Sequence, residues 1–153
     1  MPNKVTYFAY GSNMVTKRLQ EPNRAPSAKP LGRAKLPDKR FVCNKKGRDY
    51  SGKANLVVDT GHIVWGVLYE IDSADLNNLN RYEGDYKIKE MIVIDDQATQ
   101  VKAYTYISEK LTEDPRAYEC YKKIVIKGAR EHNLPDDYIK NDLETIKTKL
   151  GPN

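Results

Sequence analysis

The chain has 153 residues, of which 39% are hydrophobic and 31% charged, a composition that fits one globular domain over residues 1–153. No apolar run approaches the roughly 20 residues of a membrane-spanning helix, and the N-terminus lacks the apolar core of a signal peptide, so we expect a cytoplasmic protein with no membrane partner. The net charge of +5 could assist the binding of an anion, but the 26 basic residues are interleaved with 21 acidic ones, so nucleic acid is not an expected partner.

The N-terminal segment, residues 5–10, is rich in β-branched and aromatic residues and predicts a strand. It runs into Gly11-Ser12-Asn13, and a short helix is expected over residues 14–20. Gly11 can adopt a positive φ, and the amides that follow it stand at a helix start, where N–H groups lack intrahelical partners. Such a turn can bind a carboxylate or stabilise a developing oxyanion, although the same residues are common in an ordinary strand–helix turn.

Residues 21–60 are interrupted by four prolines, and short strands are expected near 31–36, 40–44 and 54–58. Residues 62–71 predict a longer strand. Because apolar residues occupy most of both alternating faces of that strand, we expect it to be covered on both sides.

Ser73 is predicted to cap a helix that runs to about Tyr82 and ends before Gly84. Glu83 then falls at the C-terminal end of this helix, where the helix dipole disfavours a negative charge. Burial would raise its pKa further, and such a glutamate can exchange protons near neutral pH as a general acid/base. The alternative is an exposed glutamate paired with a neighbouring cation and without a further role.

The C-terminal half predicts strands over 87–94 and 101–107, and then a helix with Asp114 as cap that ends near His132. A last helix follows Pro135, with an apolar stripe that should pack on the core: Ile139, Leu143, Ile146 and Leu150. Strands and helices mix without strict alternation. We therefore expect an α+β domain built on a curled mixed sheet or small barrel.

Four residues bear on metal and redox chemistry. Cys43 and Cys120 are far apart and are expected to be buried, reduced thiols. His62 and His132 have no second ligand at metal-binding spacing and are expected to be ordinary surface or turn residues. No metal site is predicted, and a mechanism based on a Ser-His-Asp or Cys-His arrangement has little support.

Tyrosine is frequent, with eleven residues against two Phe and one Trp. Tyr104 and Tyr106 point to one side of their strand, and Tyr118 and Tyr121 lie on one face of their helix. Tyrosines can line a pocket and offer hydroxyls to a polar ligand, or they can lie at the edge of a core with a solvated hydroxyl.

Four segments together resemble the γ-glutamyl cyclotransferase family, in order along nearly the whole chain. Residues 7–14 are similar to the family's N-terminal signature Y-F-A-Y-G-S-N-L, and residues 64–69 resemble its V-x-G-x-x-Y/W strand. Residues 79–84 resemble the segment that supplies the catalytic glutamate. The stretch that begins with Tyr121-Lys122-Lys123-Ile124 and ends at Leu134-Pro135 is closer to the γ-glutamyl cyclotransferases proper than to their γ-glutamylamine-specific relatives.

The resemblance implies a small mixed-strand β-barrel flanked by helices, with one cavity at its mouth and a cofactor-free reaction. A γ-glutamyl amino acid or peptide would cyclise to 5-oxoproline and release the free amine, with Glu83 as the acid/base. The substrate-binding residues that it implies are Tyr10, Gly11, Ser12, Asn13, Met14, Tyr86, Tyr104 and Tyr121, with Tyr106 as the alternative to Tyr104.

Three readings remain open at this point. The same site could act on glutathione, on a γ-glutamylamine or on a γ-glutamyl-protected biosynthetic intermediate. The fold could instead serve as a binding module without turnover, although a pure binder gains nothing from a carboxylate with a raised pKa. A nucleic-acid-binding protein rests on the net charge alone. A homodimer is compatible with the sequence but is not determined by it.

Overall fold

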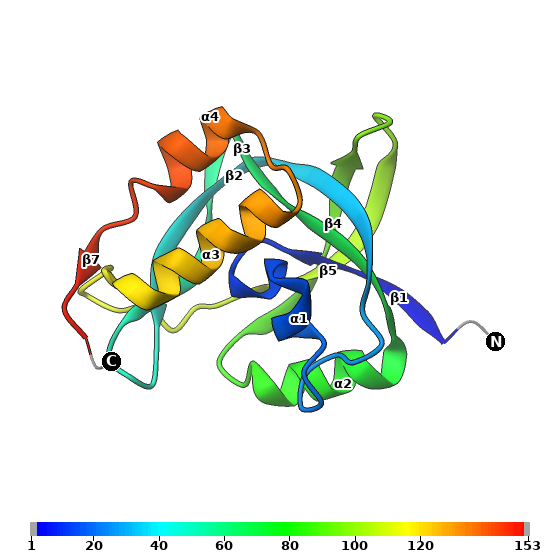
Figure 1. Cartoon of the computed structure of the whole chain (residues 1–153), viewed down its shortest axis with the longest axis horizontal. Helices are drawn as coiled ribbons and strands as arrows, with labels where there is room; N and C mark the ends of the chain where they lie inside the picture. Colours follow the sequence, from blue (N-terminus) through cyan, green and yellow to red (C-terminus); the bar gives the residue numbers. More distant parts are fainter. Residues whose placement is uncertain (1–2, 152–153) are drawn as a thin grey trace.

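The computed structural model describes residues 3–151 and contains a closed five-stranded barrel with helices packed on its outside (Figure 1). The strands follow one another around the barrel in the order β1-β3-β2-β4-β5. Their bounds are β1 Lys4–Ala9, β2 Lys29–Lys46, β3 Gly52–Asp72, β4 Lys87–Asp95 and β5 Gln100–Ile107. This architecture confirms the expected α+β class and the small mixed barrel.

One parallel pair closes the barrel. β1 pairs antiparallel with β3, with Tyr7 opposite Tyr69, and parallel with β5, where Tyr7 lies opposite Tyr104. The remaining neighbours are antiparallel. Closure gives these strands partners on both sides, so that backbone donors and acceptors are satisfied within the barrel.

The prediction of separate short strands within residues 31–58 is wrong in its boundaries. The structure has one long strand β2, whose pairing with β3 shifts register next to Pro30 and Pro37. Proline lacks the N–H that a ladder needs and is tolerated at such irregularities, so that these prolines bend the strand without ending it. In β3, residues 54–58 and 62–71 likewise join through Gly61, whose φ of 87° suits glycine.

The helix α2, Ser73–Tyr82, has the predicted bounds, but its N-cap is Asp72 and not Ser73. Asp72 makes no capping hydrogen bond through its side chain, and the Ser73 amide donates instead to the carbonyl of Asn3 at 2.6 Å. Leu79 is fully buried, and Glu83 occupies the C-cap, where its amide donates to the Leu79 carbonyl at 2.8 Å. The predicted place of Glu83 at the helix end is confirmed.

The helix α3, Glu119–Glu131, begins later than predicted, and Asp114 does not cap it. The Asp114 carboxylate binds Arg116 at 2.7 Å and Lys149 at 3.1 Å. The intervening residues Ala117–Tyr118 form β6, which pairs with β7, Thr148–Lys149. A partner distant in sequence therefore holds this segment extended and delays the start of the helix.

The C-terminal segment also departs from the expected single helix. It forms α4, Asp136–Tyr138, and a π-helical turn η2, Ile139–Leu143, before the chain extends into β7. Ile139 and Leu143 are buried, as predicted, and Ile146 packs against the core in part. Leu150 is 100% exposed, because pairing with β6 has ended the helix before it.

The core fills the barrel and the space beneath α3. Gly66, Val67, Leu68 and Tyr69 are all buried, which confirms that this part of β3 is covered on both sides.

Cys43 is buried, but Cys120 is exposed at the start of α3, which corrects the expectation of two buried thiols. No helix within residues 3–151 is long and apolar enough to cross a membrane.

Candidate active site

A small cavity opens between the loop after β1, the end of α2, the strand β5 and the helix α3. It brings together seven of the nine residues implied by the family resemblance, together with Tyr106. The side chains and backbone that line it come from Tyr7, Tyr10, Gly11, Ser12, Asn13, Ala54, Glu83, Tyr86, Tyr106 and Tyr121. Because these residues are spread over more than a hundred positions, only barrel closure assembles them.

Gly11 is required for space and not for a positive φ, which corrects the sequence-based reason. Its φ is −116°, a value that any residue can adopt. A Cβ at this position, however, would lie 2.8 Å from the Cβ of Ala54, closer than such atoms approach. The loop then enters the short 3₁₀-helix η1, Ser12–Met14.

The backbone of this loop offers donors to the cavity. The amides of Ser12 and Asn13 donate to no other backbone or side chain within residues 3–151, while Met14 and Val15 bond back into the turn. Unpaired N–H groups on a cavity wall suit a negatively charged or polarised oxygen. The role of this loop in binding an oxyanion stays a prediction, with which the hydrogen-bond pattern is compatible.

Asn13 is buried and links the loop to its surroundings. Its Nδ2 donates to the Tyr7 hydroxyl at 3.0 Å, and its Oδ1 accepts from Arg24 at 3.3 Å. Arg24, which is 4% exposed, also pairs with Glu21 at 3.1 Å and lies with its guanidinium 4.1 Å from the Tyr82 ring centroid. Neither Tyr7 nor Arg24 was predicted for the site. The hydrophobic strand and the proline-rich loop that carry them give no local signal of this role.

Among residues 3–151, Glu83 is the one carboxylate that lines the cavity. Burial raises the pKa of this carboxyl, and the nearby charges of Arg24 and Lys45 and a hydrogen bond from Asn13 oppose the rise without cancelling it. Its position at the C-cap adds the unfavourable end of the helix dipole. A carboxyl with a raised pKa exchanges protons closer to neutral pH than an exposed glutamate does.

The raised pKa of Glu83 has a consequence for stability. The folded chain binds this proton more tightly than the unfolded chain, so the stability that it contributes is present below the usual pKa of 4.5 and is lost as pH rises through the folded value. Glutamine cannot ionise and escapes this loss. We expect Glu83→Gln to increase Tm more at pH 8 than at pH 4.5, measured by thermal unfolding. A Tm difference that shrinks with rising pH would contradict the raised pKa.

The tyrosine hydroxyls mostly hold the walls in place. Tyr86 donates to the Ala54 carbonyl at 2.7 Å, and Tyr121 accepts from the Ala54 amide at 3.1 Å, so that both bind the same residue of β3. Tyr10 donates to the Tyr106 carbonyl. Burial raises the pKa of Tyr10, Tyr86 and Tyr121, which keeps these hydroxyls protonated.

Two residues implied by the resemblance lie away from the cavity. Met14 is fully buried and packs against Gly128 of α3, so it supports the loop from behind. Tyr104 lies two residues before Tyr106 on β5, and Tyr106 lines the cavity in its place. A shift of two residues leaves the face unchanged, which is why the sequence could not separate the two tyrosines.

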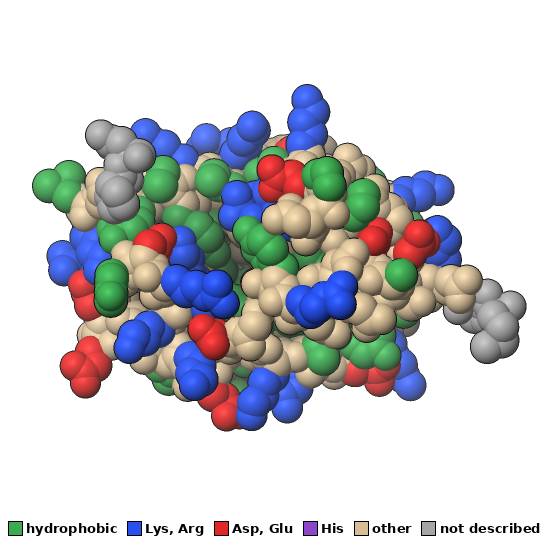
Figure 2. Space-filling model, turned by 90° about the horizontal axis from the view of Figure 1, so that it is seen from below, with side chains coloured by type: hydrophobic (Ala, Val, Ile, Leu, Met, Phe, Trp, Pro, Cys, Tyr) green, Lys and Arg blue, Asp and Glu red, His purple; other side chains and the backbone are tan. Residues whose placement is uncertain are grey.

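A larger cleft, which we call the outer cleft, adjoins the cavity and shares Glu83, Ser12, Tyr86 and Tyr121 with it. Figure 2 shows this face of the molecule hollowed, with Lys and Arg side chains around the hollow. Six cationic side chains line the outer cleft: Arg18, Arg24, Lys45, Arg48, Lys53 and Arg81. Glu83 and Asp49 are the carboxylates there.

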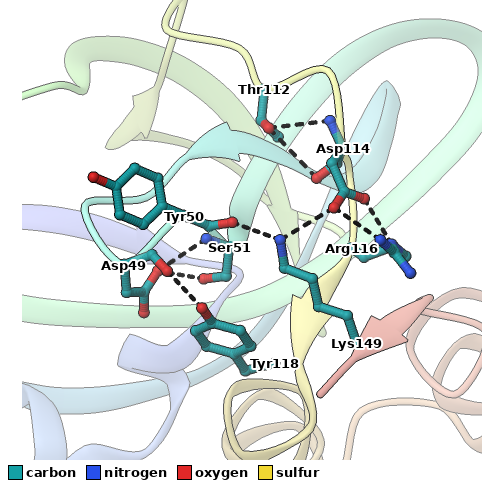
Figure 3. A network of polar contacts seen from close by, with 8 residues as sticks. All are labelled: Asp49, Tyr50, Ser51, Thr112, Asp114, Arg116, Tyr118 and Lys149. Carbon is teal, nitrogen blue, oxygen red and sulfur yellow. Dashed lines mark hydrogen bonds and ion pairs between the residues drawn. The ribbon is translucent and has the colours of Figure 1, made fainter. Parts of the chain in front are cut away.

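One wall of the outer cleft is the turn between β2 and β3, residues 47–51, and the C-terminal strand holds it in place (Figure 3). The ammonium of Lys149 donates to the Tyr50 carbonyl at 2.6 Å, and the Tyr118 hydroxyl donates to the Asp49 carbonyl. These bonds from β6 and β7 tie an exposed turn to the C-terminal part of the chain. Arg48, the cation that this turn carries, therefore has a defined place in the lining of the outer cleft.

The histidines lie outside both linings. His62 contacts Asp142 at 2.7 Å. His132 lies in the turn after α3, one of the two places expected for it, at 3.0 Å from Thr16 and with 12% of its side chain exposed. Within residues 3–151 no group of three or more His, Cys, Asp and Glu is arranged to hold a metal ion.

Comparison with known proteins places this barrel and cavity in a class. A solved structure of a γ-glutamyl cyclotransferase superposes with a TM-score of 0.88 at 28% identity, over 95% of this chain and 89% of that one. An uncharacterised human protein of known structure superposes with a TM-score of 0.90 at 28% identity, over 99% of this chain and 93% of that one. The fold is thus that of a γ-glutamyl cyclotransferase.

Sequence comparison gives the family. A model of the AIG2-like family matches residues 63–141. The γ-glutamylcyclotransferase of Homo sapiens is 33% identical over 141 residues, which cover 86% of this chain and 73% of the relative, and that of Mus musculus is 30% identical over the same shares. The chain therefore belongs to the γ-glutamylcyclotransferase family, within the AIG2-like group.

Proposed function

We propose that this protein is a cofactor-independent γ-glutamylcyclotransferase that converts a γ-glutamyl amino acid or peptide to 5-oxoproline and a free amine. The observation that carries the proposal is the placement of Glu83. It is the carboxylate of a cavity whose other wall presents the unpaired amides of Ser12 and Asn13. A proton acceptor and an oxyanion site thus share one small chamber.

The first step requires a base. The neutral α-amino group of the substrate gives up one proton as its nitrogen attacks the γ-carbonyl carbon of the same molecule, which leaves the single N–H of the 5-oxoproline ring. Glu83 accepts that proton, which the raised pKa of its carboxyl favours. Because nucleophile and electrophile belong to one molecule, the cavity mainly has to hold a folded conformer of the glutamyl group.

The second step requires an acid. As the new C–N bond forms, the γ-carbonyl oxygen becomes an oxyanion, to which the amides of Ser12 and Asn13 donate. Collapse of this intermediate breaks the bond to the leaving nitrogen, which takes the proton back from Glu83. The proton balance closes without water, metal or an external acid, and the products are 5-oxoproline and the free amine.

The direct test is release of 5-oxoproline by the purified protein from γ-glutamyl-alanine, glutathione and a γ-glutamylamine. We expect turnover of at least one γ-glutamyl compound, with equal amounts of 5-oxoproline and free amine. If every compound remains intact while the protein is folded, the proposal is wrong and the chain is a binding module on the same fold.

A further inference from the structure

We propose that the outer cleft binds the leaving half of the substrate and selects leaving groups that carry two or more negative charges. The inference rests on the proposed function, since it assigns the other half of the same substrate. It narrows the substrate class to γ-glutamyl compounds of acidic amino acids, acidic peptides or phosphorylated amines.

The balance of charge in the outer cleft is the first observation. Six cations face two carboxylates there, and one of these carboxylates is Glu83 itself. Asp49 is already paired with Lys53 at 3.1 Å, and Lys45 lies 3.8 Å from Asp85. Burial lowers the pKa of the Lys45 ammonium, an effect that an anion bound beside it would reverse. The cleft therefore holds more positive charge than its own residues neutralise.

Three arginines of the outer cleft have no carboxylate partner within residues 3–151: Arg18, Arg48 and Arg81. Arg81 donates to the neutral Asn78 side chain at 2.6 Å. The Nε of Arg18 is buried and has no hydrogen-bond acceptor. A buried donor without an acceptor costs free energy, so the Arg18 guanidinium is not fully satisfied by the chain itself.

The place of these cations relative to the reacting bond is the second observation. Glu83 lines both the cavity and the outer cleft, so a substrate bound across it has its glutamyl half inside and its leaving half outside. A guanidinium nitrogen of Arg48 lies 3.9 Å from where a Cβ on Gly84 would stand, next to Glu83. Lys53 and Lys45 lie over the rings of Tyr121 and Tyr86, with 4.5 Å and 5.0 Å to the centroids. Cationic side chains of the outer cleft therefore lie next to the tyrosines that line the cavity.

The number of cations without a carboxylate partner indicates which leaving group the outer cleft favours. A single α-carboxylate engages one guanidinium bidentately and leaves the others without a counter-charge. A second carboxylate or a phosphate brings a further anion within reach of them. A neutral amine offers nothing to the cations, so γ-glutamylamines should be the poorest substrates.

The test compares two substrates of nearly equal shape, γ-glutamyl-glutamate and γ-glutamyl-glutamine, which differ by one negative charge. We expect kcat/KM to favour the glutamate compound by roughly tenfold at low ionic strength, mainly through KM. The preference should shrink as salt screens the partly open cleft. A second pair, γ-glutamyl-phosphoserine and γ-glutamyl-serine, distinguishes phosphate from carboxylate as the preferred anion.

Matched variants locate the effect. Arg18→Ala and Arg48→Ala should each lower the acid-to-amide ratio of kcat/KM several-fold, whereas Arg40→Ala, which removes the same charge beside Asp59 and outside the cleft, should leave that ratio unchanged. Equal turnover of acid and amide by the wild type, or a ratio unaffected by both cleft variants, overturns the inference while the cyclotransferase activity stands. Absence of turnover on all four compounds and on γ-glutamyl-alanine overturns the proposed function as well.

Discussion

Replacement of Glu83 by glutamine is expected to reduce 5-oxoproline release at least ~100-fold, as loss of a general acid/base does. Glutamine has nearly the same shape as glutamate and can still accept a hydrogen bond from Asn13. It cannot take the proton of the attacking amine or return one to the leaving nitrogen. The loss should therefore fall on kcat, with little change in KM.

The measurement compares kcat and KM of Glu83→Gln with those of the wild type on the best substrate of the γ-glutamyl panel. Glu109→Gln is a matched control, because Glu109 is 73% exposed, pairs with Lys87 and lines neither the cavity nor the outer cleft. The control should retain full activity. If Glu83→Gln keeps more than a tenth of the wild-type kcat, another group performs the proton transfer.

Gly128→Ala is expected to lower both stability and activity, although alanine favours helices more than glycine does. A Cβ on Gly128 would lie 2.6 Å from the Cβ of Met14, 2.7 Å from the carbonyl carbon of Met14 and 2.8 Å from the amide nitrogen of Val15. Two of these atoms are backbone, so α3 and the substrate loop must move apart. Overpacking of this kind costs about 1–3 kcal/mol, against a propensity gain of about 1 kcal/mol or less.

The loop is expected to lose its geometry in this variant, because Met14 closes the 3₁₀ turn that presents the amides of Ser12 and Asn13. Urea unfolding measures the first effect, and kcat/KM for 5-oxoproline release measures the second. Lys127→Ala on the exposed side of the same helix is the control and should change neither by much. A Gly128→Ala protein as stable and active as the control would show that the contact yields without cost.

The groups proposed for the chemistry are carried by different elements of the fold, and these elements are joined at Ala54. Ala54 accepts from Tyr86 through its carbonyl and donates to Tyr121 through its amide, so β3, the segment after α2 and α3 meet at one residue. Glu83 is held at a helix end and the amides lie on a short 3₁₀ turn. Glu83 and the two amides are thus carried by helical elements of the fold and not by a free loop.

Several features of this protein were determined by the sequence alone. The β-branched and aromatic run of residues 5–10 predicts β1, and the apolar stretch 62–71 predicts the C-terminal half of β3. The helix over 73–82 places Glu83 at its C-terminal end, which already indicates a raised pKa. These predictions succeed because alternation, helical spacing and turn chemistry depend on near neighbours.

Other features were decided by the tertiary structure. Asp114 looked like a helix cap, but Lys149 and Arg116 compete for its carboxylate and keep the segment extended. Closure of the barrel places Tyr106 and Tyr7 in the lining of the cavity, whereas Tyr104 lies outside it. The cations of the outer cleft come from separate segments whose charges look evenly spread along the chain. In these places the side-chain contacts and the distribution of charge depend on which distant segments pair. The local sequence does not indicate that pairing.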